Sequence, residues 1–363
     1  MKLLISGGGT GGHIYPALAL VRQFKENYPD GEVLYVGTSK GLEADIVPRA
    51  GIAFETMEIT GFKRKLSLEN IKTIARFMKG VSRAKQIIKE FKPDVVVGTG
   101  GYVCAPVVYA AAKKNIPTVI HEQNSVAGLT NKFLSRYVDK IAVAFEAVMA
   151  DFPTEKVTLI GNPRATEVVQ AENNPAVLSE YGLDLTKKTA LIFGGSRGAR
   201  ALNEAIIEAL PTLAQKDYQV LCATGDIHFA QIEAAAKAIN ASNVKIVPFI
   251  YNMPAVLRNC DVVVSRAGAT SLAEFTALGL PSILIPSPYV TNNHQEKNAM
   301  ALVEKGAAEM IKQTDLSAAK LVEQLDHCLL DETYQAKMKA AALALGKPQA
   351  AQDLCDLVTD LAK

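Results

Sequence analysis

Short, fully apolar runs that alternate with helical stretches constrain the fold of this chain more than any other feature. Strands that are apolar on both faces are typical of a parallel sheet that helices cover on both sides. We therefore predict an α/β fold. The expected strands are residues 3–5, 33–36, 95–97, 118–121, 141–144, 189–193, 220–223, 244–247, 261–265 and 282–285, and the expected helices include 16–25, 106–113 and 199–213.

The alternation pauses once, at Gly161-Asn162-Pro163-Arg164 and the polar stretch 171–175, and resumes at residue 189. A chain of 363 residues is also long for a single core. We therefore predict two successive doubly wound domains, residues 1–163 and 164–340, with a hinge near residue 163. An Ala-rich helical tail follows, and we expect its last part, about 341–363, to pack back on the first domain.

Charge and cysteine usage narrow the class of protein. Residues 1–163 hold 21 Lys and Arg against 15 Asp and Glu, whereas the remainder holds 18 against 22, which suggests two modules with different partners. The five cysteines are dispersed without a CxxC pair, which indicates buried thiols in a reducing compartment. No apolar run approaches the ~18–20 residues that span a bilayer, and the first one is too short for a signal peptide. The sequence predicts a soluble or peripheral protein of the cytoplasm.

Three strand-to-helix turns are rich in glycine: residues 7–13, 98–102 and 194–199. Such turns let backbone N–H groups approach an anion, and a diphosphate is the natural guest. Tight turns without a ligand explain any single one equally well, but three across two domains favour a ligand in the cleft between them. No Lys-Ser/Thr pair follows, so none is a Walker loop. A loose GxGxxG spans residues 7–12, yet Gly37-Thr38 stand where a dinucleotide fold would need an acidic residue.

Three titratable side chains lie next to predicted turns. His13 begins a helix, where the helix dipole favours the neutral, base-competent imidazole; a histidine that only caps the helix is the alternative. Glu122 follows a strand and is either polar lining or a second carboxylate. Glu274 falls about one turn into the helix after strand 261–265. It could accept hydrogen bonds from ribose hydroxyls, or it could merely stabilise its helix dipole.

Eight segments, in order from residue 6 to about 299, carry a family resemblance: GGGTGGHIYPALAL, GTGGYVCAP, HEQNSVAGLTNKFLSR, GNPRATEV, FGGSRGARALNE, VPFIYNMP, SRAGATSLAE and TNNHQEKNA. Together they resemble the MurG family, the UDP-N-acetylglucosamine:undecaprenyl-pyrophosphoryl-muramoyl-pentapeptide N-acetylglucosaminyltransferases of glycosyltransferase family 28. One such segment would be weak evidence, but eight in family order are specific. The resemblance implies the GT-B fold, in which two Rossmann-like domains face each other across a cleft.

The resemblance also implies an activity. N-acetylglucosamine would pass from UDP-N-acetylglucosamine to the 4-hydroxyl of the muramic acid of lipid I, with inversion and without a metal, giving lipid II for peptidoglycan synthesis. No cofactor is expected, and the absence of an Asp-x-Asp pair agrees with metal independence. The implied partners are the donor, lipid I and the anionic cytoplasmic face of the bacterial cell membrane, to which the protein would bind peripherally. Proteins of the cell-wall machinery could also be partners; nucleic acid is not expected.

Site residues follow from the same resemblance. Thr10, Gly11 and Gly12 would lie beside the donor sugar and diphosphate, with Asn124 on the sugar. Arg164 and Ser196 would lie near the diphosphate and sugar, Ile250 would contact the uracil through its backbone, and Gln295 would touch the sugar or ribose. The nucleotide would be wrapped by Ala269, Thr270, Ser271, Leu272, Ala273 and Glu274, with Glu274 on the ribose. His13 is the candidate base for the acceptor hydroxyl, and Glu122 is the reserve candidate.

A basic segment suggests how the enzyme would reach a lipid-linked acceptor. Residues 63–92 hold ten Lys and Arg against two acids, and apolar residues recur there at helical spacing. A basic amphipathic helix can dock on an anionic membrane. The candidate membrane residues are Leu68, Ile71, Lys72, Ile74, Ala75, Arg76, Met78 and Lys79. The alternative is an apolar stripe that packs on the first domain and leaves a solvated basic face.

Four other functions remain open from the sequence. A UDP-N-acetylglucosamine 2-epimerase shares the architecture and nucleotide but needs no lipid acceptor. A glycosyltransferase with another acceptor and a non-catalytic nucleotide-sugar sensor are the next alternatives. A dinucleotide dehydrogenase is disfavoured by the missing ribose-binding acid. UDP release that depends on lipid I would separate the transferase from the others.

Overall fold

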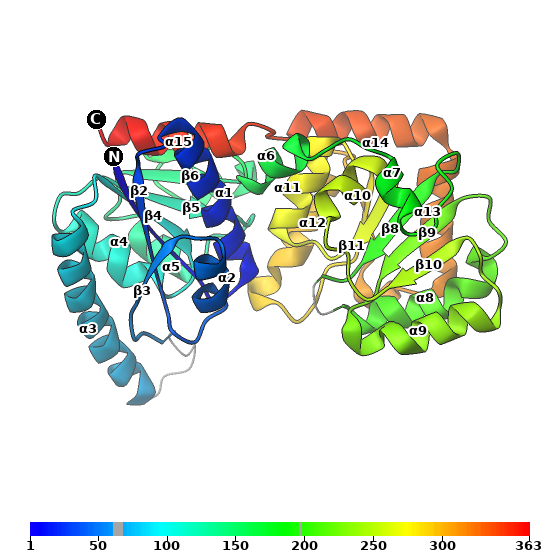
Figure 1. Ribbon diagram of the computed structural model, residues 1–363, viewed down its shortest axis with the longest axis horizontal. Coiled ribbons are helices and arrows are strands. Elements are labelled where there is room, and N and C mark those ends of the chain that lie inside the picture. Colours follow the sequence, from blue (N-terminus) through cyan, green and yellow to red (C-terminus); the bar gives the residue numbers. More distant parts are fainter. Residues whose placement is uncertain (61–67, 196–197) are drawn as a thin grey trace. The chain divides into compact units, whose positions relative to one another are not determined.

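The computed structural model describes residues 1–60, 68–195 and 198–363, and it describes side chains outside residues 61–72 and 196–197 (Figure 1). The chain forms two compact units. Unit 1 combines Met1–Arg164 with Gln349–Lys363, and unit 2 is Ala165–Pro348. Each unit is a parallel sheet with helices packed on it, so the predicted α/β fold with two doubly wound parallel sheets is confirmed.

Unit 1 is built on a seven-stranded sheet of order β3-β2-β1-β4-β5-β6-β7, and all of its pairings are parallel. The strands are β1 (Lys2–Gly7), β2 (Glu32–Gly37), β3 (Ala53–Thr56), β4 (Val95–Gly100), β5 (Thr118–Glu122), β6 (Lys140–Val143) and β7 (Val157–Leu159). The helices are α1 (Gly11–Asn27), α2 (Glu43–Arg49), α3 (Leu68–Phe91), α4 (Cys104–Ala112), α5 (Leu129–Leu134), the 3-10 helix η1 (Glu146–Asp151) and α15 (Ala350–Leu361).

The side chains of β1 alternate between two cores, as expected for a strand covered on both faces. Leu3 and Ile5 pack with residues of α1 and α15, whereas Leu4 packs with residues of α3 and α4. The return of the chain to unit 1 begins at Gln349, and α15 buries Leu354 and Val358 in the first of these cores. Residues 341–345, which the sequence analysis grouped with this tail, complete α14 in unit 2.

Unit 2 is built on a six-stranded sheet of order β10-β9-β8-β11-β12-β13, again with parallel pairings throughout. Its strands are β8 (Thr189–Phe193), β9 (Gln219–Ala223), β10 (Val244–Val247), β11 (Val262–Ser265), β12 (Ser282–Leu284) and β13 (Glu309–Met310). The α-helices are α6 (Arg164–Gln170, which starts at the boundary), α7 (Ala176–Ser179), α8 (Arg200–Leu213), α9 (Asp226–Ala238), α10 (Met253–Asn259), α11 (Ala269–Leu278), α12 (His294–Val303), α13 (Ala318–Leu330) and α14 (Glu332–Leu345). Two 3-10 helices, η2 (Thr291–Asn293) and η3 (Gln313–Asp315), complete the unit.

In both sheets the strand order reverses beside the first strand of the unit. In unit 1 this point lies between β1 and β4, and in unit 2 it lies between β8 and β11. Ligands of open α/β sheets bind at the carboxyl ends of the strands that flank such a reversal. The glycine-rich turns of the sequence follow β1, β4 and β8, so the fold brings them to these two positions.

Two further observations concern the cysteines and the helices. All five cysteines are buried, unpaired thiols, as their dispersed spacing predicted. Among the described residues, the longest and most apolar helices still fall short of what a membrane-spanning helix requires.

Candidate functional site

The turn after β1 is shaped by glycines that have no room for a side chain. Gly9 has φ +81°, a conformation that favours glycine. A Cβ on Gly7 would lie 2.0 Å from Thr99 Oγ1, and a Cβ on Gly8 would lie 2.5 Å from the Glu43 carboxyl carbon. The turn leads directly into α1, so Thr10, Gly11 and Gly12 form its amino-terminal end. The backbone N–H groups of a helix start favour an anion.

His13 lies in the first turn of α1 with its imidazole against the preceding backbone. Its Nδ1 is 2.9 Å from the Gly8 carbonyl oxygen and 3.3 Å from Thr10 Oγ1. A carbonyl oxygen only accepts, so Nδ1 carries the proton of the neutral ring. Nε2 is then the nitrogen with the basic lone pair, which is the form a general base requires.

The turn after β4 packs against His13. Thr99 Oγ1 donates to the His13 carbonyl oxygen at 2.8 Å, which ties the end of β4 to the start of α1. A Cβ on Gly100 would lie 2.7 Å from His13 Cδ2, and a Cβ on Gly101 would lie 2.4 Å from the Gly8 carbonyl oxygen. Glycines at these two positions therefore let the two turns and the imidazole form one surface.

Glu122, at the end of β5, is buried, and both of its carboxylate oxygens accept hydrogen bonds from other residues of unit 1. Its Oε1 accepts from the backbone N–H and the side-chain amide of Asn124, and its Oε2 accepts from Gly128 N–H and Asn131 Nδ2. Glu122 is only 3% exposed. Its carboxylate therefore holds the Asn124 loop in place.

Two buried side chains, Gln123 and His121, connect the Asn124 loop to Gly161, near the end of the first part of unit 1. Gln123 Nε2 donates to Thr99 O at 2.7 Å and to His121 Nδ1 at 3.0 Å, and His121 Nε2 donates to Gly161 O at 2.8 Å. The chain of contacts fixes His121 in its Nε2–H form. Burial, opposed only by the Gly161 carbonyl, lowers the pKa of His121 to about 4, so it is neutral at physiological pH.

Arg164 lies at the end of this segment and faces the first helix. Its guanidinium is 5.6 Å from the ring centroid of Tyr15, a cation–π distance. Its backbone N–H donates to Asn162 Oδ1 at 3.1 Å, which shapes the Gly161–Arg164 turn. Within unit 1, residues 10–13 therefore lie against the turn after β4. Glu122 anchors Asn124 through hydrogen bonds.

Unit 2 has a hollow of ≈ 720 Å³ at the carboxyl ends of β8, β11 and β12. Two predicted donor-site residues, Ser271 and Gln295, line it together with the glycines of the turn after β8. Gln295 Oε1 accepts from Ser287 N–H at 2.8 Å, which fixes its amide. Ser196 lies outside the described residues.

The other predicted residues of unit 2 lie on α11 and after β10. Ala269, Leu272 and Glu274 are buried, Thr270 and Ala273 are partly exposed, and all belong to α11. Glu274 is 6% exposed and lies in the second turn of that helix. Ile250, just after β10, is 2% exposed, so its side chain belongs to the packed interior.

The sequence analysis missed Arg266, which lines the same hollow. Its guanidinium donates to Ile285 O at 3.0 Å and to Gln313 Oε1 at 2.7 Å, and both acceptors are neutral. No carboxylate among the described residues forms an ion pair with it. Its positive charge is therefore held in place but not neutralised, which suits a phosphate group. In the sequence, Arg266 directly follows a buried strand, and this position could have identified it as a candidate ligand-binding residue.

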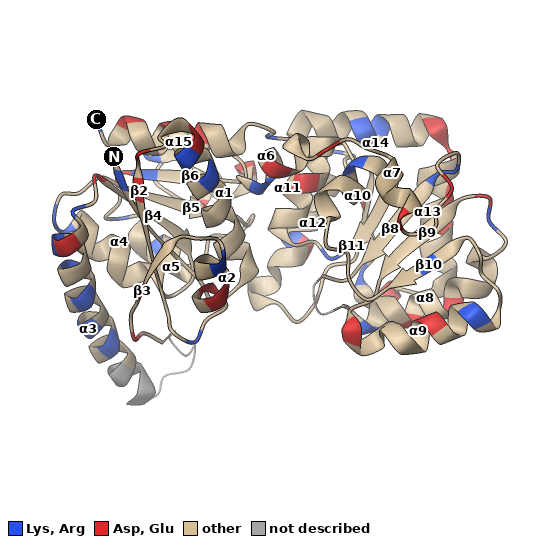
Figure 2. Ribbon diagram, viewed as in Figure 1, with Lys and Arg blue, Asp and Glu red and all other residues tan. Residues whose placement is uncertain are grey.

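The candidate membrane residues divide along α3. Ile74, Ala75, Arg76, Met78 and Lys79 are exposed, with Ile74 at 54% and Met78 at 59%, whereas Val81 and Ile88 further along are buried. The alternative of a packed stripe therefore fits the second half of the helix and also Thr73 and Phe77, but not Ile74 and Met78. The side chains of Leu68, Ile71 and Lys72 lie outside the described residues. Lys and Arg recur along the coloured part of α3 (Figure 2).

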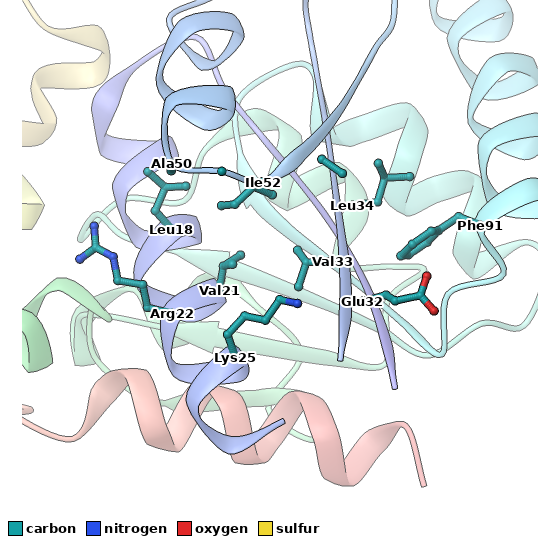
Figure 3. A pocket seen from close by; sticks show the side chains of 12 residues that line it. Leu18, Val21, Arg22, Lys25, Glu32, Val33, Leu34, Ala50, Ile52 and Phe91 are labelled. Carbon is teal, nitrogen blue, oxygen red and sulfur yellow. The ribbon is translucent and has the colours of Figure 1, made fainter. Parts of the chain in front are cut away.

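Unit 1 has a hollow of ≈ 550 Å³ by the amino end of β2, beside α1 (Figure 3). Two of its charged side chains are already engaged: Lys25 Nζ donates to Gly31 O, and Glu32 pairs with Lys2 at 2.9 Å. These contacts leave the hollow few groups to offer a ligand. Its lining also places it at the amino ends of the strands, opposite the glycine-rich turns. No cluster of three or more His, Cys, Asp or Glu suited to a metal ion occurs among the described residues.

Comparison with known proteins places this geometry in a family. Residues 3–143 match the glycosyltransferase family 28 N-terminal domain, and residues 189–354 match the C-terminal domain of that family. The chain is 57% identical, over 100% of both chains, to a UDP-N-acetylglucosamine--N-acetylmuramyl-(pentapeptide) pyrophosphoryl-undecaprenol N-acetylglucosamine transferase of Bacillus cereus. This chain belongs to the MurG family of glycosyltransferases.

Solved structures agree on the fold. The crystal structure of Acinetobacter baumannii MurG is similar with a TM-score of 0.81 and 29% identity, over 99% of each chain. A UDP-GlcNAc 2-epimerase from Neisseria meningitidis, solved with UDP-GlcNAc, is similar with a TM-score of 0.67 and 14% identity, over 99% of this chain and 100% of that one. At that identity the second likeness concerns the fold alone. GT-B architecture is thus shared by the MurG family and by the epimerase that the sequence left as an alternative.

Proposed function

We propose that this chain transfers N-acetylglucosamine from UDP-N-acetylglucosamine to the 4-hydroxyl of the muramic acid of lipid I, forming lipid II. The observation that carries the proposal is the full-length identity of 57% to a transferase whose name states this donor and acceptor. The polar groups of both units support it. Unit 2 offers the nucleotide a hollow with a fixed cation, and unit 1 offers the acceptor an oriented imidazole.

His13 is the general base in this proposal. As the acceptor oxygen attacks the anomeric carbon, its proton passes to His13 Nε2, the nitrogen that Nδ1–H···O=C Gly8 leaves basic. The new bond joins the acceptor oxygen to the anomeric carbon, and the bond from that carbon to the diphosphate breaks on the opposite face. The transfer therefore inverts the anomeric configuration. Glu122 is the weaker candidate because both of its oxygens already accept hydrogen bonds, from Asn124, Gly128 and Asn131.

The leaving group is UDP, whose diphosphate gains negative charge as the bond breaks. Arg266, the start of α11 and the backbone of the turn after β8 line the hollow that would receive it. Fixed donors and a cation of this kind stabilise developing charge without a metal ion. Glu274 accepts from the ribose, and Arg164 with Asn124 orients the donor sugar in this proposal. We therefore expect a reaction that needs neither a metal nor another cofactor.

The acceptor's polyprenyl tail keeps it in the membrane, so the enzyme binds the anionic cytoplasmic surface peripherally in this proposal. Exposed Ile74 and Met78 of α3 support it, together with Leu129 and Phe133 of α5, which are 67% and 38% exposed. The two helices are joined through aromatic rings, since Phe77 and Phe133 lie 5.9 Å apart edge to face. Arg76, Lys79 and Lys132 lie on the same helices. Such a surface inserts apolar tips while its cations meet lipid phosphates.

Analysis of the products tests this proposal against the epimerase alternative. Purified protein is incubated with UDP-N-acetylglucosamine and a soluble lipid I analogue, and the products are examined by mass spectrometry and proton NMR. The proposal predicts an acceptor heavier by one N-acetylhexosamine residue, joined through a β linkage. Conversion of the donor to its C2 epimer, with the acceptor unchanged, would instead establish an epimerase.

A further inference from the structure

Glu43 begins α2 and carries a buried carboxylate that no cation neutralises. The residue is 0% exposed, and no Lys or Arg among the described residues pairs with it. Instead Oε1 accepts from Thr38 N–H at 3.0 Å and from Thr38 Oγ1 at 2.7 Å, while Oε2 accepts from Gly9 N–H at 3.0 Å. A buried charge is tolerated when polar groups of this kind surround it.

The space around this carboxylate is made by glycines from three places in the sequence. A Cβ on Gly8 would lie 2.5 Å from the Glu43 carboxyl carbon, one on Gly37 would lie 2.6 Å from Glu43 Cγ, and one on Gly41 would lie 2.2 Å from Oε1. Side-chain atoms do not approach this closely, so any larger residue at these positions would displace the carboxylate. The site is therefore built around Glu43.

Glu43 and His13 bind opposite ends of one peptide group. The N–H of Gly9 donates to Glu43 Oε2, and the carbonyl of Gly8 accepts from His13 Nδ1 at 2.9 Å. These two atoms belong to the same planar unit, so fixing one end fixes the direction of the other. Without the carboxylate, a peptide between two glycines could rotate at little cost, because glycine has a wide choice of backbone angles.

We propose that Glu43 is a positioning residue for the transfer reaction: it fixes the Gly8–Gly9 peptide, whose carbonyl holds the His13 imidazole in the orientation and tautomer that leave Nε2 basic. The inference rests on the proposed function for its kinetic consequence, but its structural part concerns His13 alone. Glu43 does not touch the reacting atoms. It acts on them through a peptide group, as an outer carboxylate orients a catalytic or metal-bound imidazole elsewhere.

The ionisation state of Glu43 agrees with this role. Burial raises the pKa of its carboxyl, but the hydrogen bonds from Thr38 and the backbone outweigh burial, and the net pKa is lowered. An ionised carboxylate has no proton to offer Gly9 N–H and can only accept from it. The hydroxyl of Tyr35 donates to Gly7 O at 2.9 Å, which also fixes the start of the turn.

The test replaces Glu43 by glutamine in the full chain. Glu43→Gln keeps the shape and one oxygen for Thr38, but turns an NH₂ group toward Gly9 N–H. The matched control is Thr38→Val, which removes a different hydrogen bond to the same carboxylate. The measurements are kcat, KM for UDP-N-acetylglucosamine, and the tautomer of His13 by ¹⁵N NMR of histidine-labelled protein.

The proposal predicts Nδ1–H His13 in the wild type and in Thr38→Val, and a mixture of tautomers in Glu43→Gln. It predicts that Glu43→Gln lowers kcat by at least about tenfold, a part of the ~10²–10⁴-fold that a general base contributes, with KM for the donor unchanged. An Nε2–H tautomer in the wild type, or equal losses in both variants, would overturn it. The NMR arm needs no substrate, so it gives an answer about Glu43 even if the wild type transfers no sugar. If Glu43→Gln does not fold, an Nε2–H tautomer in the wild type still contradicts the proposal.

Discussion

His13 owes its basic nitrogen to its neighbours rather than to its own position in a helix. Nδ1 is bound to the Gly8 carbonyl, the His13 carbonyl accepts from Thr99, and Gly100 leaves room for the ring. All of these contacts lie in unit 1, whereas the hollow with Arg266 lies in unit 2. Changes at the two positions should therefore separate chemistry from nucleotide binding.

The first residue-scale prediction concerns His13. His13→Ala should lower kcat by ~10²–10⁴-fold, because the acceptor hydroxyl loses its general base. Binding of UDP, measured by calorimetry, should stay close to that of the wild type. His228→Ala on α9 is the control and should change neither quantity. A variant of His13 that keeps the wild-type rate would exclude this residue as the base.

The second concerns Arg266. Arg266→Met should weaken UDP binding by roughly 10- to 150-fold, since a hydrogen bond to a charged group contributes about 1.5–3 kcal/mol. The affinity for uridine, which has no phosphate, should change much less. The comparison of the two ligands by calorimetry separates lost phosphate contact from general damage to the hollow. Equal losses for UDP and uridine would contradict a phosphate role.

Residues of the site could be predicted where they stand next to a recognisable turn. His13 directly follows a glycine-rich turn, whereas Asn124 and Ser271 were expected only through the family resemblance. Glu43 and Thr99 could not be predicted, because their contacts with the first turn span 34 and 86 residues of sequence. No local pattern reports such a separation, which only the packing of strands β1, β2 and β4 creates.

At the scale of elements, α3 contains two kinds of surface. Its second half buries Val81, Ala84 and Ile88 in the core of unit 1, while its first half exposes Ile74 and Met78. Amphipathic spacing predicted the helix but could not tell which half would be covered. The exposed half is the part of the helix on which the proposal of membrane binding depends.

Replacing both exposed residues tests that proposal. Ile74→Glu with Met78→Glu should weaken binding to vesicles that contain anionic lipid by at least about tenfold, because burial of each apolar side chain contributes ~1.5–3 kcal/mol. Co-sedimentation with vesicles measures the effect, and Ile227→Glu on α9, where Ile227 is 82% exposed, is the matched control. Unchanged binding by the double variant, or the same loss in the control, would argue against α3 as the docking element.

Strands inside the two sheets were predicted more completely than strands at the sheet edges. The ten expected strands all occur, with boundaries shifted by a few residues at most. The strands that were missed, β3, β7 and β13, all lie at sheet edges. Each of these three strands has two to four residues, none of them buried, so it lacks the continuous apolar run by which most other strands were found.

At the scale of the whole molecule, stability should depend on pH through a buried histidine. The folded pKa of His121 is about 4, below the ordinary value of 6.5, because burial disfavours the imidazolium. As pH falls below about 6.5 the unfolded chain binds a proton that the folded chain does not, so stability falls until about pH 4.

The loss from this residue should approach about 2 kcal/mol at pH 5. Urea unfolding of the wild type and of His121→Gln at pH 7 and pH 5 measures it. The wild type should lose more stability than the variant over this interval, whereas His228→Gln should follow the wild type. Parallel losses in the wild type and His121→Gln would show that His121 is not the source.

In the proposed function, this chain is a transferase whose chemistry depends on a lipid-linked acceptor and on no metal. UDP release from UDP-N-acetylglucosamine, measured in EDTA with and without a soluble lipid I analogue, tests it most directly. We expect release that requires the acceptor and is unchanged by EDTA. A folded, UDP-binding protein that releases UDP equally without the acceptor, or releases none with it, would contradict the proposed function.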